Sequence, residues 1–219
     1  MQLILATSNP HKVDEARLIL APLGVSLSSL ADLGCELPEP VEDGASFEDN
    51  ARIKARYYAR ALGERCLAED SGIEVDALGG SPGVHSARYA GIDGTRAERD
   101  RANNEKLIAQ LKGVPENQRL ARFVCTLALA DRTGAILAET RGTYEGVITD
   151  TPRGDNGFGY DPLLYLPELG CTSAELTAEQ KHARSHRGKA LSELVRRFGA
   201  LLSKTGGSIP QVPPPTRSE

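Results

Sequence analysis

Leu67-Ala68-Glu69-Asp70-Ser71-Gly72 is the stretch from which the organisation of this sequence is most easily understood. Its apolar residues indicate a buried strand, and Ser71 and Gly72 predict a sharp turn directly after it. We therefore expect two adjacent carboxylates in a loop at the carboxyl end of a strand. Such a loop suits Mg²⁺, which binds through one or two carboxylates plus substrate phosphates. A purely structural interpretation also exists, because an acidic pair before Ser-Gly is common in turns and helix caps.

Composition narrows the class of protein. A content of 40% hydrophobic and 26% charged residues among 219 is typical of a globular protein with a sizeable core. No run approaches the roughly 18 apolar residues that cross a bilayer, and the first residues lack a basic leader, so we expect a cytoplasmic protein without a membrane partner. The net charge of −4 argues against a broad nucleic-acid surface and favours a small-molecule partner.

The cysteines are widely spaced and contain no C-x-x-C pair. They are Cys35, Cys66, Cys125 and Cys171. This spacing indicates neither a zinc site nor a disulfide framework, so we expect free thiols.

The N-terminal segment predicts a strand, a tight loop and a helix. An apolar run is interrupted by Thr7-Ser8-Asn9-Pro10, after which apolar residues recur at helical spacing as far as Leu23. A helix N-terminus offers free backbone N–H groups and a partial positive charge, which together attract an anion. The candidate anion-binding side chains are Thr7, Ser8, Asn9 and Lys12. In the structural alternative, Ser8 or Asn9 caps the helix and Lys12 faces water.

A second helix is predicted from Ser46, which has the residue type and spacing of a helix cap, to about Gly63. Its apolar stripe consists of Phe47, Ala51, Ala55, Tyr58 and Leu62. Asn50 and Lys54 lie off this stripe, facing either a cleft or water. Glu42, just ahead of the helix, is either a further metal ligand or an exposed loop carboxylate.

The middle of the chain is rich in strand patterns. Strands are expected at residues 25–30, 73–78 and 122–130, with one or two more, antiparallel to the last, within 136–148, and a polar helix at 95–111. Residues 79–91 form a long loop framed by glycine clusters, and its Ser86, Arg88 and Tyr89 favour a functional loop.

Residues 153–162 alternate glycines with Phe158 and Tyr160. Flat apolar side chains on such a backbone suit a planar ring such as a base, although both aromatic residues would equally pack on the core. Farther on, Ser185 is expected to cap the last helix, which places His186 and Arg187 in its first turn. Cations at this end oppose the helix dipole, which favours an anionic or carbonyl-bearing ligand beside them.

The domain organisation expected from these patterns is simple. Residues 1–204 are predicted to form one domain. Residues 205–219, which contain Gly206-Gly207 and Pro213-Pro214-Pro215, are predicted to form a disordered tail.

The order of the short motifs is more specific than any one of them. They are SNPHK (8–12), FEDNARIKA (47–55), AEDSG (68–72), GGSPGVHSARYAG (79–91), GDNGFGYDPL (154–163), AELTAEQK (174–181) and SHRGKAL (185–191). This set, from residue 2 to about residue 200, resembles the inosine/xanthosine triphosphate pyrophosphatase family of purine nucleotide hydrolases.

The resemblance implies an α/β fold in which helices flank an elongated mixed β-sheet and two lobes surround a central nucleotide-binding cleft. It also implies a homodimer that uses Mg²⁺ to hydrolyse ITP, dITP and XTP to the monophosphate and pyrophosphate, which cleanses the nucleotide pool.

By the same resemblance each motif residue has an expected role. Asp70 is the catalytic residue, as base or metal ligand, and Asp70, Glu42 and Glu69 are the candidate metal ligands. The triphosphate set is Thr7, Ser8, Asn9 and Lys12, and Ser71 contacts substrate beside Asp70. The nucleoside set is Phe158, Gly159, Tyr160, Asp161, Lys181, His186 and Arg187. The family's acidic pair is Asp-Asp, so Glu69 here leaves its own ligand role open.

Selection of substrate is expected to depend on the 6-oxo group of the base. A donor aimed at this group would be left unpaired by the 6-amino group of ATP, at a cost of about 1 to 3 kcal/mol per contact. Arg187 and backbone N–H groups are the candidate donors. Two other functions stay open: a septum-inhibitor-type pyrophosphatase acting on dTTP or UTP, and a nucleotide sensor without catalysis.

Overall fold

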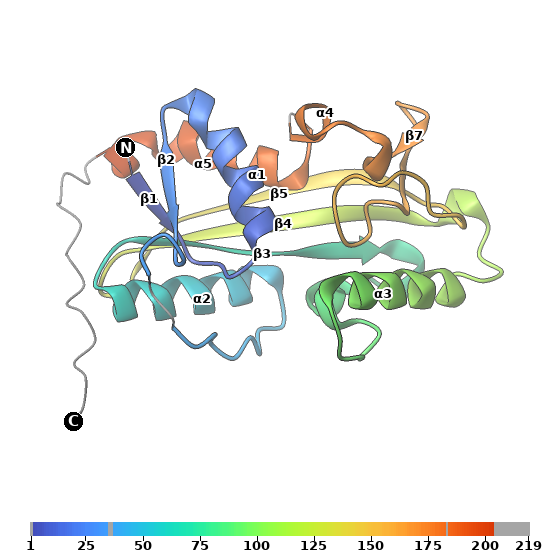
Figure 1. Cartoon of the computed structure of the whole chain (residues 1–219), viewed down its shortest axis with the longest axis horizontal. Helices are drawn as coiled ribbons and strands as arrows, with labels where there is room; N and C mark the ends of the chain where they lie inside the picture. The colour runs from blue at the N-terminus through green and yellow to red at the C-terminus, as the bar shows by residue number, and fades with distance from the viewer. Residues whose placement is uncertain (1, 35–36, 183, 204–219) are drawn as a thin grey trace.

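The computed structural model describes residues 2–34, 37–182 and 184–203 and contains one seven-stranded mixed sheet, in the order β2-β1-β3-β4-β5-β6-β7 (Figure 1). The strands are β1 (Gln2–Leu5), β2 (Ser26–Ser29), β3 (Cys66–Val75), β4 (Leu120–Ala130), β5 (Ile136–Ile148), β6 (Leu164–Leu166) and β7 (Cys171–Thr172). β1 runs parallel to β2 and β3, and the remaining neighbours are antiparallel.

Helices cover both faces of the sheet. They are α1 (Pro10–Leu20), α2 (Phe47–Leu62), α3 (Arg96–Gln110), α4 (Ala178–His182) and α5 (His186–Ser203), with a 3₁₀ segment η3 (Gly83–Arg88). Figure 1 shows α1 and α5 on one face and α2 and α3 on the other, along the elongated β3-β4-β5 ribbon. One hydrophobic cluster lies under α1 and α5, a second joins α2 to the sheet, and a third packs α3 at the far end. These layers confirm the predicted elongated, two-lobed α/β architecture.

Local cap signals correctly predicted two helices. The Ser46 side chain accepts a hydrogen bond from the Asp49 N–H, and α2 ends at Gly63 in the left-handed conformation with φ +65°. The Ser185 hydroxyl accepts a hydrogen bond of 3.0 Å from the Gly188 N–H at the start of α5. Both helices bury an apolar stripe, which stabilises them more than propensity does.

The prediction that the strand ends in an acidic loop is wrong. β3 continues through Glu69, Asp70 and Gly72 to Val75, and every residue of it is paired with β4. Gly72 serves close packing rather than a turn, because a Cβ there would lie 2.3 Å from the Ser86 hydroxyl oxygen. Ladder pairing along the whole strand therefore outweighs the local turn preference of Ser-Gly. The 136–148 segment likewise forms one unbroken strand, β5.

The edge of β3 is open where the acidic residues lie. β1 pairs with β3 only at Cys66 and Leu67 and ends at Leu5, so β3 has a single neighbouring strand from Ala68 onward within the described part of the chain. Side chains from both faces of β3 reach this opening.

Three of the four cysteines are described, and all three are free thiols, as predicted. Burial raises the pKa of the Cys66 thiol to about 12. Cys35 and the predicted tail at 205–219 lie outside the described residues. No described helix has both the length and the apolar character needed to span a bilayer.

Candidate active site

A cavity of about 340 Å³ lies at the open edge of β3 and is lined by both lobes. Every site residue predicted from the sequence lines it. These are Thr7, Ser8, Asn9, Lys12, Glu42, Glu69, Asp70, Ser71, Phe158, Gly159, Tyr160, Asp161, Lys181, His186 and Arg187. Segments far apart in the chain therefore meet in one cleft.

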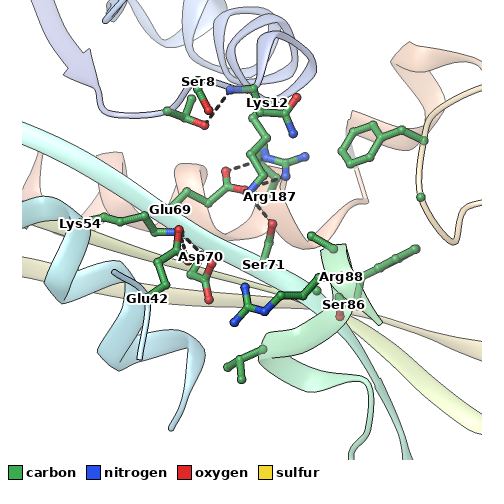
Figure 2. A pocket seen from close by; sticks show the side chains of 18 of the residues that line it. Ser8, Lys12, Glu42, Lys54, Glu69, Asp70, Ser71, Ser86, Arg88 and Arg187 are labelled. Atoms are coloured by element: carbon green, nitrogen blue, oxygen red, sulfur yellow. Dashed lines mark hydrogen bonds and ion pairs between the residues drawn. The ribbon is translucent and has the colours of Figure 1, made fainter. Parts of the chain in front are cut away.

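Glu69 and Asp70 do not act as a pair. Successive side chains of a strand point to opposite faces, so Asp70 faces α2 while Glu69 faces α1 and α5 (Figure 2). The Asp70 carboxylate accepts hydrogen bonds from Lys54 Nζ at 2.8 Å and Asn50 Nδ2 at 3.3 Å. The Glu69 carboxylate accepts two of 2.7 Å from Arg187. The two acidic residues thus have separate partners and separate chemistry.

The Asp70 side of the cleft holds a second carboxylate. Lys54 Nζ lies 3.0 Å from Glu42 Oε2 and so bridges Glu42 and Asp70. Burial alone would lower the pKa of Lys54, but the charges of Asp70 and Glu42 outweigh it and raise that pKa above its ordinary value. A lysine that is charged at neutral pH therefore marks a cation-favouring position between two carboxylates.

These two carboxylates fit a divalent cation that is shared with a phosphorylated ligand. Mg²⁺ usually takes one or two carboxylates and completes its octahedron with water and phosphate oxygens. Within the described residues no three histidine, cysteine or acidic side chains form a metal cluster by themselves. The donor set of Glu42 and Asp70 thus matches a metal that arrives with its substrate, not a permanent all-protein site.

Glu69 belongs to a buried ion-pair network on the other face. Arg187, which is 0% exposed, binds Glu69 through Nε and Nη2 and Glu15 through Nη1. Lys12 Nζ lies 3.2 Å from Glu69, and Lys181 Nζ lies 3.5 Å from Glu15. Burial would raise the pKa of Glu69, but the charges of Arg187 and Lys12 hold it well below 4.5. The carboxylate of Glu69 is thus engaged by cations of the protein itself.

The loop between β1 and α1 is built by capping. The Asn9 side chain accepts a hydrogen bond of 3.1 Å from the His11 N–H, and the backbone carbonyl of Asn9 accepts hydrogen bonds from the N–H groups of Lys12 and Val13. The expectation of free N–H groups is therefore wrong for this first turn, because Asn9 satisfies them. The loop instead presents the hydroxyls of Thr7 and Ser8 and the charge of Lys12 to the cleft. The Ser8 hydroxyl donates to Glu39, which lies on the facing loop.

The two aromatic residues of the glycine-rich loop have different environments. Tyr160 is buried in the core and its hydroxyl donates 2.9 Å to the Ser86 carbonyl, which matches the structural interpretation. Phe158 remains in the cleft, stacked on His11 at 5.6 Å between centroids and lying 4.7 Å from the Arg96 guanidinium. Phe158 is therefore an aromatic side chain that a planar ligand in the cleft can contact.

Asp161 holds this loop in place through hydrogen bonds. Its carboxylate accepts hydrogen bonds from the Phe158 N–H at 2.9 Å, Lys181 Nζ at 2.6 Å and the Ser173 hydroxyl at 2.8 Å. On the opposite side, Asp100 and Asn104 of α3 bind the N–H and the carbonyl of Gly159, each at 3.0 Å. The loop is thus held from both lobes.

The first turn of α5 carries no unbalanced charge. Burial, with the nearby Arg187 charge, holds the pKa of His186 well below 6.5, so this imidazole is neutral. Its ring stacks on Phe123 at 5.1 Å, and among the described residues its buried Nδ1 has no hydrogen-bond partner. The charge of Arg187 is balanced by Glu69 and Glu15, so protein carboxylates supply the negative charge that was expected from a ligand.

Comparison with known proteins identifies the family. Residues 3–197 match the model of the Ham1 family. The chain belongs to the Ham1 family. It is 50% identical over 200 residues to the dITP/XTP pyrophosphatase of Syntrophobacter fumaroxidans, covering 91% of this chain and 83% of that protein. It is also 50% identical over 198 residues to the dITP/XTP pyrophosphatase of Thermus thermophilus, covering 90% and 92%.

Solved structures agree. A HAM1 protein from Coxiella burnetii has a TM-score of 0.79 at 37% identity, covering 94% of this chain and 100% of its own. The dITP/XTP pyrophosphatase of Mycobacterium abscessus has a TM-score of 0.69 at 44% identity, covering 89% and 99%. The predicted family and fold are both confirmed.

The site contains residues to which the sequence patterns assigned no definite role. Glu15 bridges Arg187 and Lys181, and its position three residues after Lys12 on one helix face was an available signal. Asn50 and Lys54 were expected to face either a cleft or water; Lys54 lines the cavity, whereas Asn50 is buried, and both donate hydrogen bonds to Asp70. The clamp of Asp100 and Asn104 on Gly159 spans more than 50 residues, so no local pattern indicated it.

Proposed function

We propose that this chain hydrolyses the non-standard purine nucleoside triphosphates dITP, ITP and XTP to the monophosphate and pyrophosphate. The observation that carries the proposal is Asp70, held by Lys54 beside Glu42 at the open edge of β3. The names of the relatives from Syntrophobacter fumaroxidans and Thermus thermophilus support the same substrate class.

Asp70 is the residue we assign to the attacking water. Its carboxylate orients a water molecule toward the α phosphorus and takes up the proton as the water oxygen forms its bond there. The bond to the α–β bridging oxygen breaks, and the electron pair leaves with pyrophosphate. Glu42 and Asp70 would hold Mg²⁺, which supplies charge neutralisation on the phosphate oxygens. Glu69 is the weakest of the three metal candidates, because Arg187 and Lys12 engage its carboxylate.

The triphosphate is assigned to the β1–α1 loop. Lys12 supplies charge, and Thr7, Ser8 and Asn9 supply polar groups beside it. Binding there exchanges the contact of Ser8 with Glu39 for one with phosphate. Ser71 is assigned to a substrate contact on the same face of β3 as Glu69, to which its hydroxyl donates at 2.9 Å and with which Lys12 pairs.

The nucleoside is assigned to the part of the cavity beside the loop that carries Phe158. Phe158 offers its ring to the base, while Gly159, Tyr160, Asp161 and Lys181 fix the loop that carries it. His186 and Arg187 line the same cavity, and the Arg187 guanidinium lies 5.9 Å from the centre of the Phe158 ring. The unpartnered Nδ1 of the neutral His186 supports a polar contact with the base. A group left unpaired by the wrong base costs about 1 to 3 kcal/mol, which sets the expected scale of selection against ATP.

The proposal also includes a cytoplasmic homodimer that acts on free nucleotides and binds neither nucleic acid nor membrane. The net charge of −4 supports the absence of a nucleic-acid partner. Light scattering coupled to size-exclusion chromatography measures the molar mass in solution. The mass of a dimer is expected, and the mass of a monomer would contradict the proposed homodimer.

The substrate class is tested by measuring pyrophosphate release from dITP, XTP, dATP, dGTP and dTTP, each with Mg²⁺ and with EDTA. Metal-dependent release confined to dITP and XTP is expected. Release from dTTP alone would assign the chain to a pyrimidine pyrophosphatase, and tight binding of ITP without turnover would assign it to a sensor.

A further inference from the structure

Most cations that line the cleft are already neutralised by the protein. Lys12 is paired with Glu69 and Lys54 with Asp70, and the remaining buried cations, Lys181 and Arg187, are likewise bound to carboxylates. A triphosphate that enters this cleft therefore meets few uncompensated positive charges. A cation without a carboxylate partner therefore contributes more to the attraction between the site and the phosphate charges.

Arg88 is such a cation. It lines the same cavity and is exposed, and none of the described residues forms an ion pair with its guanidinium or accepts a hydrogen bond from it. The two other arginines that line the cavity from this lobe are both engaged. Arg96 lies over the Phe158 ring and 3.6 Å from Asp100, and Arg99 donates to the Gly94 carbonyl at 3.1 Å.

The backbone that carries Arg88 is firmly held. Two residues earlier, the Ser86 hydroxyl accepts a hydrogen bond of 2.9 Å from the Ile73 N–H and donates one of 2.6 Å to the Gly83 carbonyl. The Ser86 carbonyl in turn accepts from Tyr160 at 2.9 Å. Close contact with Gly72 completes the packing of η3 on β3. The backbone at Arg88 is therefore fixed relative to β3, the strand that carries Asp70.

Figure 2 shows the side chain of Arg88 extending from η3 into the cleft toward Asp70, on the wall opposite Lys54. Because its backbone is held in place and its side chain is exposed, Arg88 is suited to contact a ligand in the cleft. A guanidinium is permanently charged and binds two phosphate oxygens at once, which an ammonium does not do with the same geometry.

We propose that Arg88 is a further catalytic residue, which binds the phosphate chain of the substrate and stabilises the charge that develops as pyrophosphate leaves. This inference rests on the proposed function and extends it by one residue. As the bond to the α–β bridging oxygen breaks, the electron pair passes to that oxygen, and Arg88 faces the departing charge from the side that Lys54 and Glu42 do not cover. An arginine acting in this way stabilises the transition state more than the ground state.

The test compares Arg88→Ala, Arg88→Lys and a matched control, Arg101→Ala. Arg101 is an arginine of the same lobe whose side chain is 83% exposed, pairs with Glu105 and does not line this cavity. We expect Arg88→Ala to lower kcat for dITP by about 10²- to 10³-fold, the usual cost of removing one transition-state donor, with a smaller change in KM. Arg88→Lys should recover part of kcat, added guanidinium should restore part of the activity of Arg88→Ala, and Arg101→Ala should match the wild type.

A kcat of Arg88→Ala within threefold of the wild type would overturn the inference. Failure of the Arg88 inference is distinguished from failure of the proposed function by measuring the affinity for Mg²⁺-pyrophosphate calorimetrically. This measurement does not depend on turnover. If the wild type hydrolyses none of the nucleotides, the proposed function fails, while weaker pyrophosphate binding by Arg88→Ala would still support phosphate contact. Unchanged pyrophosphate affinity would reject Arg88 as a phosphate ligand. Equal unfolding temperatures of the variants verify that the fold is intact.

Discussion

Replacing Glu69 by Gln separates a structural role for this residue from a metal-binding role. The substitution keeps the shape of the side chain but removes the charge that faces Arg187 at 2.7 Å and Lys12 at 3.2 Å. Arg187 then stays fully buried with Glu15 as its one carboxylate partner.

The expected cost follows from this burial. Removing one partner of a buried ion pair destabilises by roughly 3 to 5 kcal/mol, because the other charge is left uncompensated. Since Glu15 still compensates Arg187 in part, we expect the lower end, about 3 kcal/mol. For a chain of this length such a loss lowers Tm by about 6 to 12 °C.

Thermal unfolding followed by circular dichroism, in EDTA and in Mg²⁺, measures this effect. The matched control is Glu105→Gln, because the Glu105 side chain is 64% exposed and pairs with Arg101 within one helix. Removing such a surface pair should cost less than about 1 kcal/mol. A Tm of Glu69→Gln within 2 °C of the wild type in EDTA, with a loss that appears only in Mg²⁺, would refute the structural role and restore Glu69 as a metal ligand.

Three further substitutions test other parts of the site. Asp70→Asn should abolish turnover of dITP and leave its binding largely intact, so near-normal turnover would remove Asp70 from catalysis. Gly72→Ala should destabilise the fold by about 1 to 3 kcal/mol in chemical denaturation, because its Cβ would lie 2.3 Å from the Ser86 hydroxyl. The pKa of His186 is depressed well below 6.5, so its contribution to stability is present above the unfolded-state pKa and lost as pH falls. His186→Gln should therefore lose less Tm than the wild type between about pH 7.5 and pH 5.5, and an equal loss would contradict the buried, neutral imidazole.

Local signals were sufficient to predict the helices that matter most for the site. Ser46 and Gly63 delimit α2 because caps act within a few residues of the chain. Ser185 predicted the start of α5 for the same reason. Which elements line the cleft followed from the motif order and the family resemblance, and the cavity contains every residue so predicted.

Long-range pairing was the information that the sequence patterns lacked. Ser71-Gly72 has a turn preference, yet ten consecutive pairs between β3 and β4 keep the strand extended through it. That continuity places Glu69 and Asp70 on opposite faces, which no property of the dipeptide itself indicates. The partner of Glu69, Arg187, is 118 residues away, so its ion pair became visible only in the folded chain.

The most direct test of the central claim is hydrolysis of dITP in ¹⁸O-labelled water, with the label traced in both products. Attack of water on the α phosphorus beside Asp70 predicts one labelled oxygen in dIMP and none in pyrophosphate. Label in pyrophosphate instead, or release of inorganic phosphate in place of pyrophosphate, would contradict the assignment of this cleft as a site that cleaves between the α and β phosphates.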